Sequence, residues 1–294
     1  MSERLETPQE DQPKRPDAQA LLSPSVPSSM TFPCLRFFIE DLDAITFVAF
    51  TDAAAQHLDD IYKEMAKGAT PSADESLSTE IIAHARRGIG AQALVRSYER
   101  IVAEMIICRA ADNFIAYLAE LLALIFRAEP RTLASMDLKF EEVLDHPELD
   151  ELVAVLAEKR VSQLSRDSFS ELSAYFEKAH KITLIDDLEK LKRITYFIAL
   201  RNLIVHNRRI ADSKFARQSG EATVQIGQVV PMTDDVFGVL ELLREAVAEI
   251  DERVATKYKI ERPHSDRDFW GVFTALRRMG DQQTTPEARD AARS

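Results

Sequence analysis

Glycine occupies only 8 of the 294 positions, and few segments alternate apolar and polar residues with a period of two. Strands show that alternation and tight hairpins favour glycine, so the sequence predicts helices rather than sheets. No apolar run reaches the length of a transmembrane helix, and the N-terminus lacks the basic-then-apolar order of a signal peptide. We therefore expect a protein without a membrane partner.

Cysteine is also scarce. Cys34 and Cys108 stand in apolar surroundings, with no CxxC or His/Cys cluster nearby. They read as reduced core residues, which favours a cytoplasmic protein over a disulfide scaffold. No P-loop, dinucleotide glycine fingerprint, nucleophile elbow or zinc motif is present, so no cofactor and no metal is predicted.

Composition divides the chain into four predicted parts. Residues 1–30 combine five prolines with charged and small polar residues, which is typical of disorder. We expect an N-terminal helical extension over 31–90, a helical domain over 91–260 and a C-terminal tail over 261–294 that contains one short helix.

Helical spacing and end signals predict the elements of an all-α bundle. The expected helices are Leu35–Lys67, Leu77–Arg127, Glu148–Leu164, Ser168–Ala179, a helix capped by Asp186 that runs to Asn207, Thr233–Tyr258 and a short one around Phe269–Met279. Ile101–Phe126 is apolar on nearly all sides and is expected at the centre of the bundle. Ala222–Val230 is rich in β-branched residues and predicts a short hairpin or strand-like loop after the motif helix.

The first predicted helix carries four phenylalanines, which we interpret as core or dimer contacts: Phe37, Phe38, Phe47 and Phe50. His180 closes a predicted helix, where a cationic imidazole is favourable. His57 has no companion at metal-ligand spacing, so we expect a surface or core role for it.

One apolar helix is interrupted by groups that can do chemistry. Arg201, Asn202 and His206 lie among apolar side chains that point in every direction around the helix. A guanidinium buried in such surroundings costs several kcal/mol unless a partner compensates it. Asn202 and His206 are four residues apart and share a face.

The charge distribution singles out the same segment. The chain has a formal net charge of -12, which disfavours nucleic acid over most of its surface. From Lys190 to Arg217, however, eight basic residues face one acid, Asp212. A phosphate backbone would be tolerated there, and the candidate RNA contacts are Arg208, Arg209, Lys214 and Arg217.

The run Ala199-Leu-Arg-Asn-Leu-Ile-Val-His-Asn207 resembles the signature of the HEPN superfamily (higher eukaryotes and prokaryotes nucleotide-binding), in which Arg and a polar residue precede His. Asp112–Leu118 resembles the preceding core helix of that family, and the likeness covers about Gln92–Tyr258. The resemblance implies an all-α bundle that dimerises, and often a metal-independent endoribonuclease used as a toxin or in phage defence and held in check by an antitoxin or regulatory partner. Arg201, Asn202 and His206 match the motif, and Asp112 is the nearest candidate for the acidic residue of the earlier helix.

The chemistry of RNA cleavage suits these residue types. RNA carries its own nucleophile, the 2′-OH, so a site needs a proton acceptor, a proton donor and positive charge. Histidine transfers protons near neutral pH, and arginine holds phosphoryl oxygens with a forked set of donors. Because Arg201 and His206 point about 140° apart on one helix, a dimer that supplies two imidazoles fits better than one copy.

Two alternatives remain open at this point. In the first, Arg201 forms an ion pair with a carboxylate such as Asp112 or Glu120 across the bundle, and His206 caps the helix. The basic residues that follow are then an ordinary solvent-exposed helix terminus. Alternatively, the domain is a HEPN-like binding or assembly module without catalysis.

Overall fold

The computed structural model describes residues 25–66, 99–135, 148–167, 169–219, 224–232 and 236–283, which form helices and connections without a strand, as an all-α bundle requires. In chain order the elements are α2 (Phe32–Ala66), α5 (Glu99–Ala128), the 3-10 helix η1 (Pro130–Ser135), α7 (Leu149–Asp167), α8 (Phe169–Tyr175), the π-helical turn η2 (Phe176–His180), α9 (Leu188–Asn207), α10 (Ser213–Gln218), α11 (Val236–Tyr258) and α12 (Asp266–Gln283). Within these ranges, no helix is both long and apolar enough to cross a membrane. The predicted domain boundary at 90, the proline-rich residues 1–24 and Ser168 lie outside the described residues.

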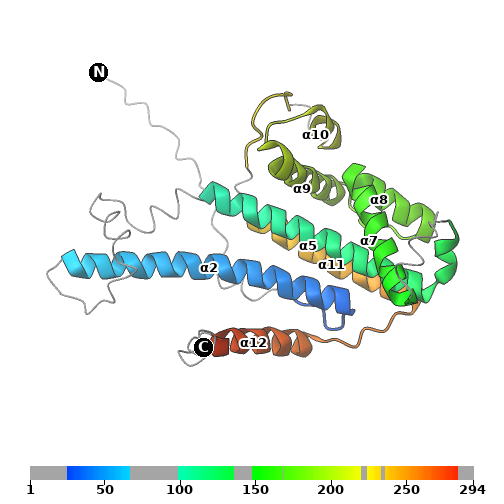
Figure 1. The fold of residues 1–294 in the computed structure, drawn as a ribbon, viewed down its shortest axis with the longest axis horizontal. Helices are drawn as coiled ribbons and strands as arrows, with labels where there is room; N and C mark the ends of the chain where they lie inside the picture. The colour runs from blue at the N-terminus through cyan, green and yellow to red at the C-terminus, as the bar shows by residue number, and fades with distance from the viewer. Residues whose placement is uncertain are drawn as a thin grey trace, which may run out of the picture.

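Helix α5 forms the centre of the bundle, as its apolar composition predicted. It packs against α2, α7, α9 and α11, and Figure 1 shows it between α2 on one side and α9 on the other, with α11 behind. Phe114, Leu118 and Phe126 are fully buried along its length. A helix that is apolar on most sides is stable in water only when neighbours cover those sides, and the flanking helices do so here.

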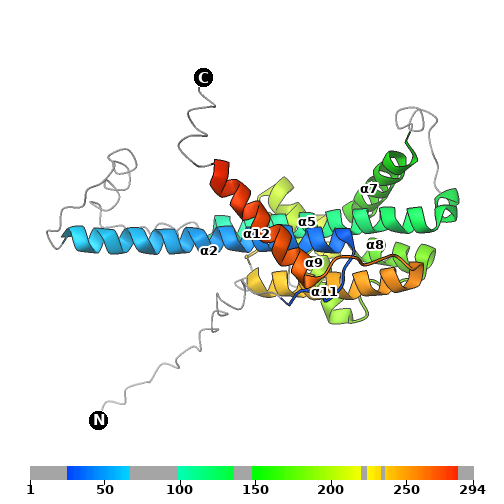
Figure 2. The same cartoon turned by 90° about the horizontal axis from the view of Figure 1, so that it is seen from below.

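Helix α2 is attached to the bundle by its N-terminal half. The carboxylate of Asp251, on α11, accepts hydrogen bonds from the backbone N–H and the hydroxyl of Thr31, at 3.0 and 2.5 Å, where α2 begins. Deeper in the interface, Arg244 Nε donates to Asp41 across 2.5 Å, with both side chains almost fully buried. On the other side α12 crosses α2 (Figure 2), with the ring of Phe269 against Phe38.

Helix α9 begins one residue later than the sequence predicted. Asp187, rather than Asp186, caps it by accepting hydrogen bonds from the backbone N–H groups of Glu189 and Lys190, at 2.7 and 3.1 Å. Both aspartates are suitable caps by composition, and the backbone conformation of Asp187 decides between them. Asp186 instead forms an ion pair with Arg253 of α11.

The C-terminal end of α9 is closed by an unusual turn. Arg208 and Arg209 both have left-handed backbone conformations, with φ of 50° and 63°. The chain after them is held by backbone hydrogen bonds between Ala211 and Gln228 and between Val230 and Arg209, each 2.8 Å long. We call residues 208–211 and 224–230 the clip. Its described residues 224–230 fall in the predicted strand-like loop Ala222–Val230, and there Val229 forms an isolated bridge with Ile210 rather than part of a strand.

The expectation of a cationic His180 is wrong. The imidazole is buried, lies among the rings of Phe126, Tyr175, Phe176 and Tyr258, and has Nδ1 3.1 Å from the Tyr258 hydroxyl. Burial, with a smaller contribution from the positive charge of Lys257, lowers its pKa to about 4. The aromatic cluster excludes water from the protonated imidazole, and this desolvation cost outweighs the favourable interaction of a cation with the helix terminus.

We predict that breaking the Asp41–Arg244 pair strongly destabilises the fold. Asp41→Ala leaves a buried guanidinium without its partner, so the free energy of unfolding falls by about 3–5 kcal/mol. The control is Glu120→Ala, which breaks the more exposed Arg36–Glu120 pair and costs less than about 1 kcal/mol. Urea unfolding of the three proteins checks this, and equal losses would contradict it.

We predict that His180 makes the protein less stable in acid. The unfolded imidazole gains its proton near pH 6.5 and the folded one only near pH 4, so the unfolded state binds more protons in between. The stability that neutral His180 contributes is complete above pH 6.5 and is lost as the pH falls towards 4. Between pH 8 and pH 5 the wild type should lose about 2 kcal/mol more than His180→Gln in urea titrations. Identical pH profiles for the two proteins would rule this out.

Candidate functional site

Arg201 meets a carboxylate of the central helix. Its Nη2 lies 2.6 Å from Oδ1 of Asp112, and its Nη1 donates to Oδ1 of Asn202 across 2.9 Å. Nε is buried and has no hydrogen-bond partner in the described part of the chain. Asp112 is expected from the sequence both as a candidate site residue and as a structural partner of Arg201, and the structure brings Asp112, Arg201 and Asn202 together.

A second ion pair lies two turns away along the same helices. Arg209 Nε is 2.9 Å from Oε1 of Glu104, and Arg209 Nη1 donates to the carbonyl of Val230 across 3.0 Å. The two pairs show that α5 and α9 run antiparallel, because the earlier acid of α5 meets the later arginine, which lies in the turn that follows α9. Sequence reasoning missed Glu104, although its position eight residues before Asp112 places both acids on the same side of α5.

His206 lies on the solvent side of the same helix end. It is exposed and has no hydrogen-bond or ion-pair partner among the described residues. The structure therefore does not bring the imidazole of His206 to the guanidinium of Arg201 within one chain. It also leaves the imidazole open to a ligand, unlike the buried ring of His180.

The candidate RNA contacts divide into two groups. Arg208, Lys214 and Arg217 are exposed and have no ion-pair partner in the ranges that the structure describes. Arg209 differs, because its side chain is only 12% exposed and its guanidinium is already engaged by Glu104 and Val230. Asp212 caps α10 by accepting the N–H of Phe215 at 2.7 Å, so the one acid of this segment serves the backbone.

Cys108 lies between Glu104 and Asp112 of α5 and is half-buried with a free thiol. Burial, then the negative charge of Asp112, raises its pKa, and Arg201 offsets this only in part. The thiol is therefore protonated at neutral pH and is not a nucleophile. No group of three or more His, Cys, Asp or Glu residues within the described ranges is arranged to hold a metal ion.

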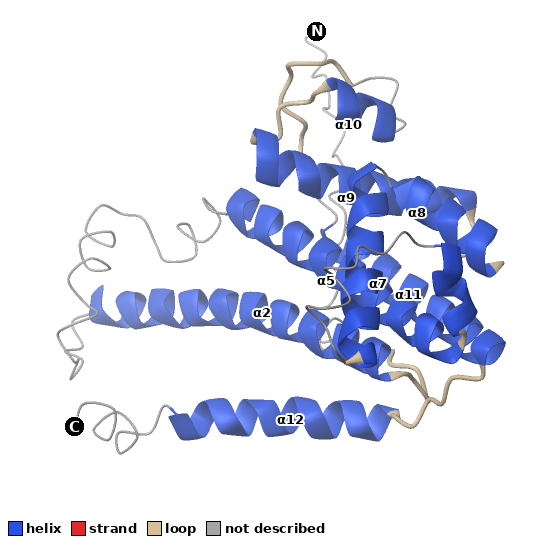
Figure 3. Cartoon of the chain, turned by 45° about the vertical axis from the view of Figure 1, so that its right-hand side comes forward, coloured by secondary structure: helices blue, strands red, loops and turns tan. Residues whose placement is uncertain are grey.

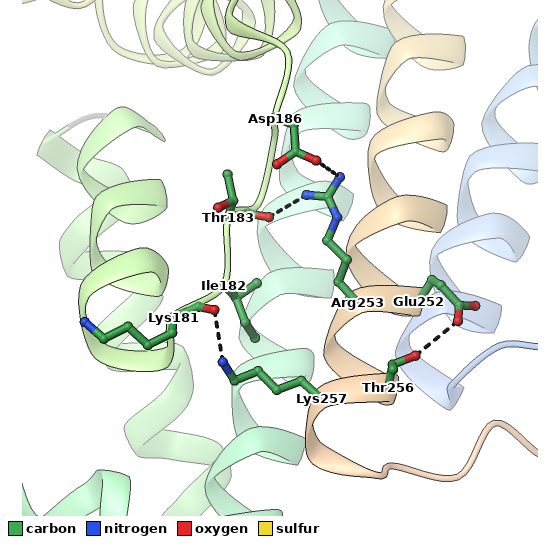
Figure 4. A pocket seen from close by; sticks show the side chains of 8 residues that line it. All are labelled: Lys181, Ile182, Thr183, Asp186, Glu252, Arg253, Thr256 and Lys257. Atoms are coloured by element: carbon green, nitrogen blue, oxygen red, sulfur yellow. Dashed lines mark hydrogen bonds and ion pairs between the residues drawn. The ribbon is translucent and has the colours of Figure 1, made fainter.

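Two surface cavities lie near these elements. One of about 190 Å³ lies between α2 and α5, and Asp112 is part of its lining. A larger one of about 450 Å³ lies between the segment that precedes α9 and the C-terminal part of α11 (Figure 4). Because Arg201 is 13 residues along α9 from Leu188, the helix separates it from this cavity by about 20 Å. Its charged side chains are engaged with their surroundings: Arg253 with Asp186, and Lys257 with the carbonyl of Lys181. The end of α9 near Arg201 therefore remains the better candidate site.

Comparison of the chain with protein-family models, with curated proteins and with solved structures gives no match in any of the three. The likeness to the HEPN superfamily therefore rests on the residues of α9 and α5 alone. The contact between Arg201 and Asp112 is compatible with a ribonuclease site, with a HEPN-like module without catalysis and with a purely structural ion pair.

We predict a modest energetic coupling between Arg201 and Asp112. Their side chains are 28% and 52% exposed, so solvent weakens the pair. A double-mutant cycle with Arg201→Gln and Asp112→Asn should give a coupling of about 0.5–1.5 kcal/mol. The control is Arg127–Asp150, whose side chains are 42% and 79% exposed and whose coupling should be near zero. Two equal couplings would contradict the prediction.

Proposed function

We propose that the chain is a metal-independent endoribonuclease of the HEPN type. The observation that supports the proposal is that the C-terminal part of α9 carries both a guanidinium held at the α5 interface, that of Arg201, and an exposed imidazole, that of His206. Around them, Arg208, Lys214 and Arg217 supply positive charge in a chain of net charge -12. A polyanion is attracted to that segment more than to the rest of the surface.

In the proposed reaction, one His206 imidazole removes the proton of a ribose 2′-OH. The 2′ oxygen attacks the adjacent phosphorus, and the bond from phosphorus to the 5′ oxygen breaks. A second imidazole donates a proton to the departing 5′ oxygen, so the products are a 2′,3′-cyclic phosphate and a 5′-hydroxyl. Because each chain has one His206, the second imidazole comes from another copy.

Arg201 stabilises the transition state in this scheme. Two of its nitrogens already have partners, Asp112 and Asn202. When substrate binds, a phosphoryl oxygen therefore either displaces the Asp112 carboxylate from the Arg201 guanidinium or binds the guanidinium alongside it. Asn202 keeps the guanidinium oriented. Removal of a charged donor from such a site costs about 10²–10³ in rate.

The alternative function is a HEPN-like binding or assembly module without catalysis. The specific observation that favours it is the closed Arg201–Asp112 contact, which satisfies the guanidinium without a phosphate. Such a module retains RNA or protein binding at the cationic segment but cleaves nothing. A role as a toxin or phage-defence effector in the cytoplasm, restrained by an antitoxin or regulatory protein, is part of the catalytic proposal.

We predict that cleavage of single-stranded RNA in the presence of a metal chelator depends on His206. His206→Ala should lower the rate by about 10²–10⁴ because it removes the proton-transfer group. Arg201→Ala should lower it as well. His57→Ala is the matched control, since it removes an exposed imidazole of α2 and should leave the rate unchanged.

The measurement is gel analysis of end-labelled RNA, with treatment of the products to detect the cyclic phosphate. A wild type that cleaves no RNA, or a His206→Ala variant as active as His57→Ala, would sink the catalytic proposal. RNA binding without cleavage would support the module instead.

A further inference from the structure

One side chain joins the cavity between α2 and α5 to the proposed site. Asp112, whose carboxylate meets Arg201 of α9, is also part of the lining of this cavity of about 190 Å³. Figure 1 and Figure 3 show α5 between α2 and α9, so one helix contributes to both places. From Asp112 the lining continues along α5 to Glu120, eight residues or about 12 Å further on. We call this cavity the α2–α5 groove.

The size and the floor of the α2–α5 groove suit one small planar group. Sites for drug-sized ligands have volumes of about 300–1,000 Å³, which is more than this groove offers. Phe37 and Tyr117 are buried in its lining, whereas Ala116 is exposed and fills little space with its methyl group. Asn113 donates through Nδ2 to the carbonyl of Phe37 across 2.9 Å, which leaves its Oδ1 as an acceptor. A single ring system therefore fits better than a peptide segment.

Two ion pairs connect α2 and α5 beside the groove. Arg36 donates through Nη1 to Oε1 of Glu120 across 2.8 Å, and Arg109 donates through Nη2 to Oε2 of Glu40. Among the described residues, the second oxygen of each carboxylate has no hydrogen-bond partner. The two arginines are 57% and 58% exposed, so their remaining nitrogens are within reach of a ligand. Arg253 in the larger cavity differs, because four groups of the protein already hold its guanidinium.

The charges around the groove favour a neutral ligand. Together with Arg201 there are three arginines and three acids: Arg36, Arg109, Arg201, Glu40, Asp112 and Glu120. Because these formal charges cancel, a second phosphate gains little from entering the groove. A neutral group that both donates and accepts hydrogen bonds gains more, because it meets carboxylates and guanidinium groups together. The nucleobase next to a phosphate at Arg201 is such a group.

Guanine is the base whose edges match this set of side chains. Its N1–H and N2–H are neighbouring donors, and one carboxylate accepts from both. Its O6 and N7 are neighbouring acceptors, which the fork of one arginine satisfies. Adenine and cytosine place a ring-nitrogen acceptor beside their amino group, and a carboxylate repels it. Uracil has a single donor between two acceptors, so it uses only one oxygen of a carboxylate.

We propose that the α2–α5 groove binds the guanine base of the nucleotide whose phosphate lies at Arg201. Glu120 accepts from N1–H and N2–H, and Arg36, already in contact with Glu120, donates to O6 and N7. The distance along α5 between Asp112 and Glu120 leaves room for the ribose between the phosphate and that edge of the base. The inference rests on the proposed function, because RNA supplies both base and phosphate, and it adds a sequence preference.

The first test is calorimetric titration of the full chain with the four nucleoside 3′-monophosphates. The wild type should bind guanosine 3′-monophosphate at least about 10-fold more tightly than the other three. Glu120→Gln should raise its dissociation constant by at least about 10-fold and remove the preference, because the amide nitrogen opposes the donors of guanine. Arg36→Gln should do the same. Asp150→Asn is the matched control, since it removes one acid of the exposed Arg127–Asp150 pair and should leave binding unchanged.

Equal binding of the four nucleotides, no binding of any, or a preference that survives both groove variants would overturn the proposal. The Arg36–Glu120 pair is exposed, so both variants should keep the circular dichroism spectrum of the wild type. Arg201→Gln should weaken all four nucleotides by the same factor and keep the preference, because it removes only the phosphate contact.

The second test maps the cut sites in a single-stranded RNA of mixed sequence. The wild type should cleave next to guanosines, and Glu120→Gln should cleave without that preference. Cleavage by the wild type at all four nucleotides alike would contradict the groove and leave the ribonuclease standing. Guanine-selective binding without cleavage would contradict the ribonuclease and leave the groove standing, so the two failures are distinguishable.

Discussion

The α5–α9 interface is the constraint on which the site depends. Helix α5 is buried on most sides, and two of its acids, Glu104 and Asp112, lie on the side that meets α9. Arg201 of α9 and Arg209 of the turn after it pair with these acids in antiparallel order, alongside the apolar contacts of Ile107 with Leu200 and Leu203. Since partly buried charges without partners are costly, a shift of α9 by one turn would leave both acids and both arginines unpaired.

That register determines what the end of α9 presents to solvent. With Arg201 and Arg209 turned towards α5, the remaining polar groups of the segment, His206 and Arg208 among them, face outward. The clip after the helix, held by Arg209 through the carbonyl of Val230, keeps the chain folded back beside them. Arg201 and Arg209 are thus paired with carboxylates, and the free positive charge of this end comes from Arg208, Lys214 and Arg217. A catalytic and a structural interpretation therefore share Arg201.

The sequence predicted the helical class and the central position of α5, because the periodicity of apolar residues is a local signal. It also predicted a carboxylate partner for Arg201, Asp112 or Glu120, because a buried guanidinium is costly without one. It did not predict Glu104, since the partner of Arg209 depends on the register between two distant helices. It misplaced the cap of α9, because Asp186 and Asp187 differ only in backbone conformation. The neutral state of His180 follows from ring contacts that come from α5, η2 and α11 and that no single segment reveals.

The central claim is that a phosphodiester meets the protein at the end of α9. The most direct measurement is a crystal structure of the full chain with a short RNA whose 2′ oxygens are methylated, so that it cannot be cleaved. The account predicts a phosphate within hydrogen-bond distance of Arg201 and an imidazole of His206, with Asp112 displaced from or sharing the guanidinium. An Arg201 still closed on Asp112, with the RNA elsewhere or absent, would contradict it.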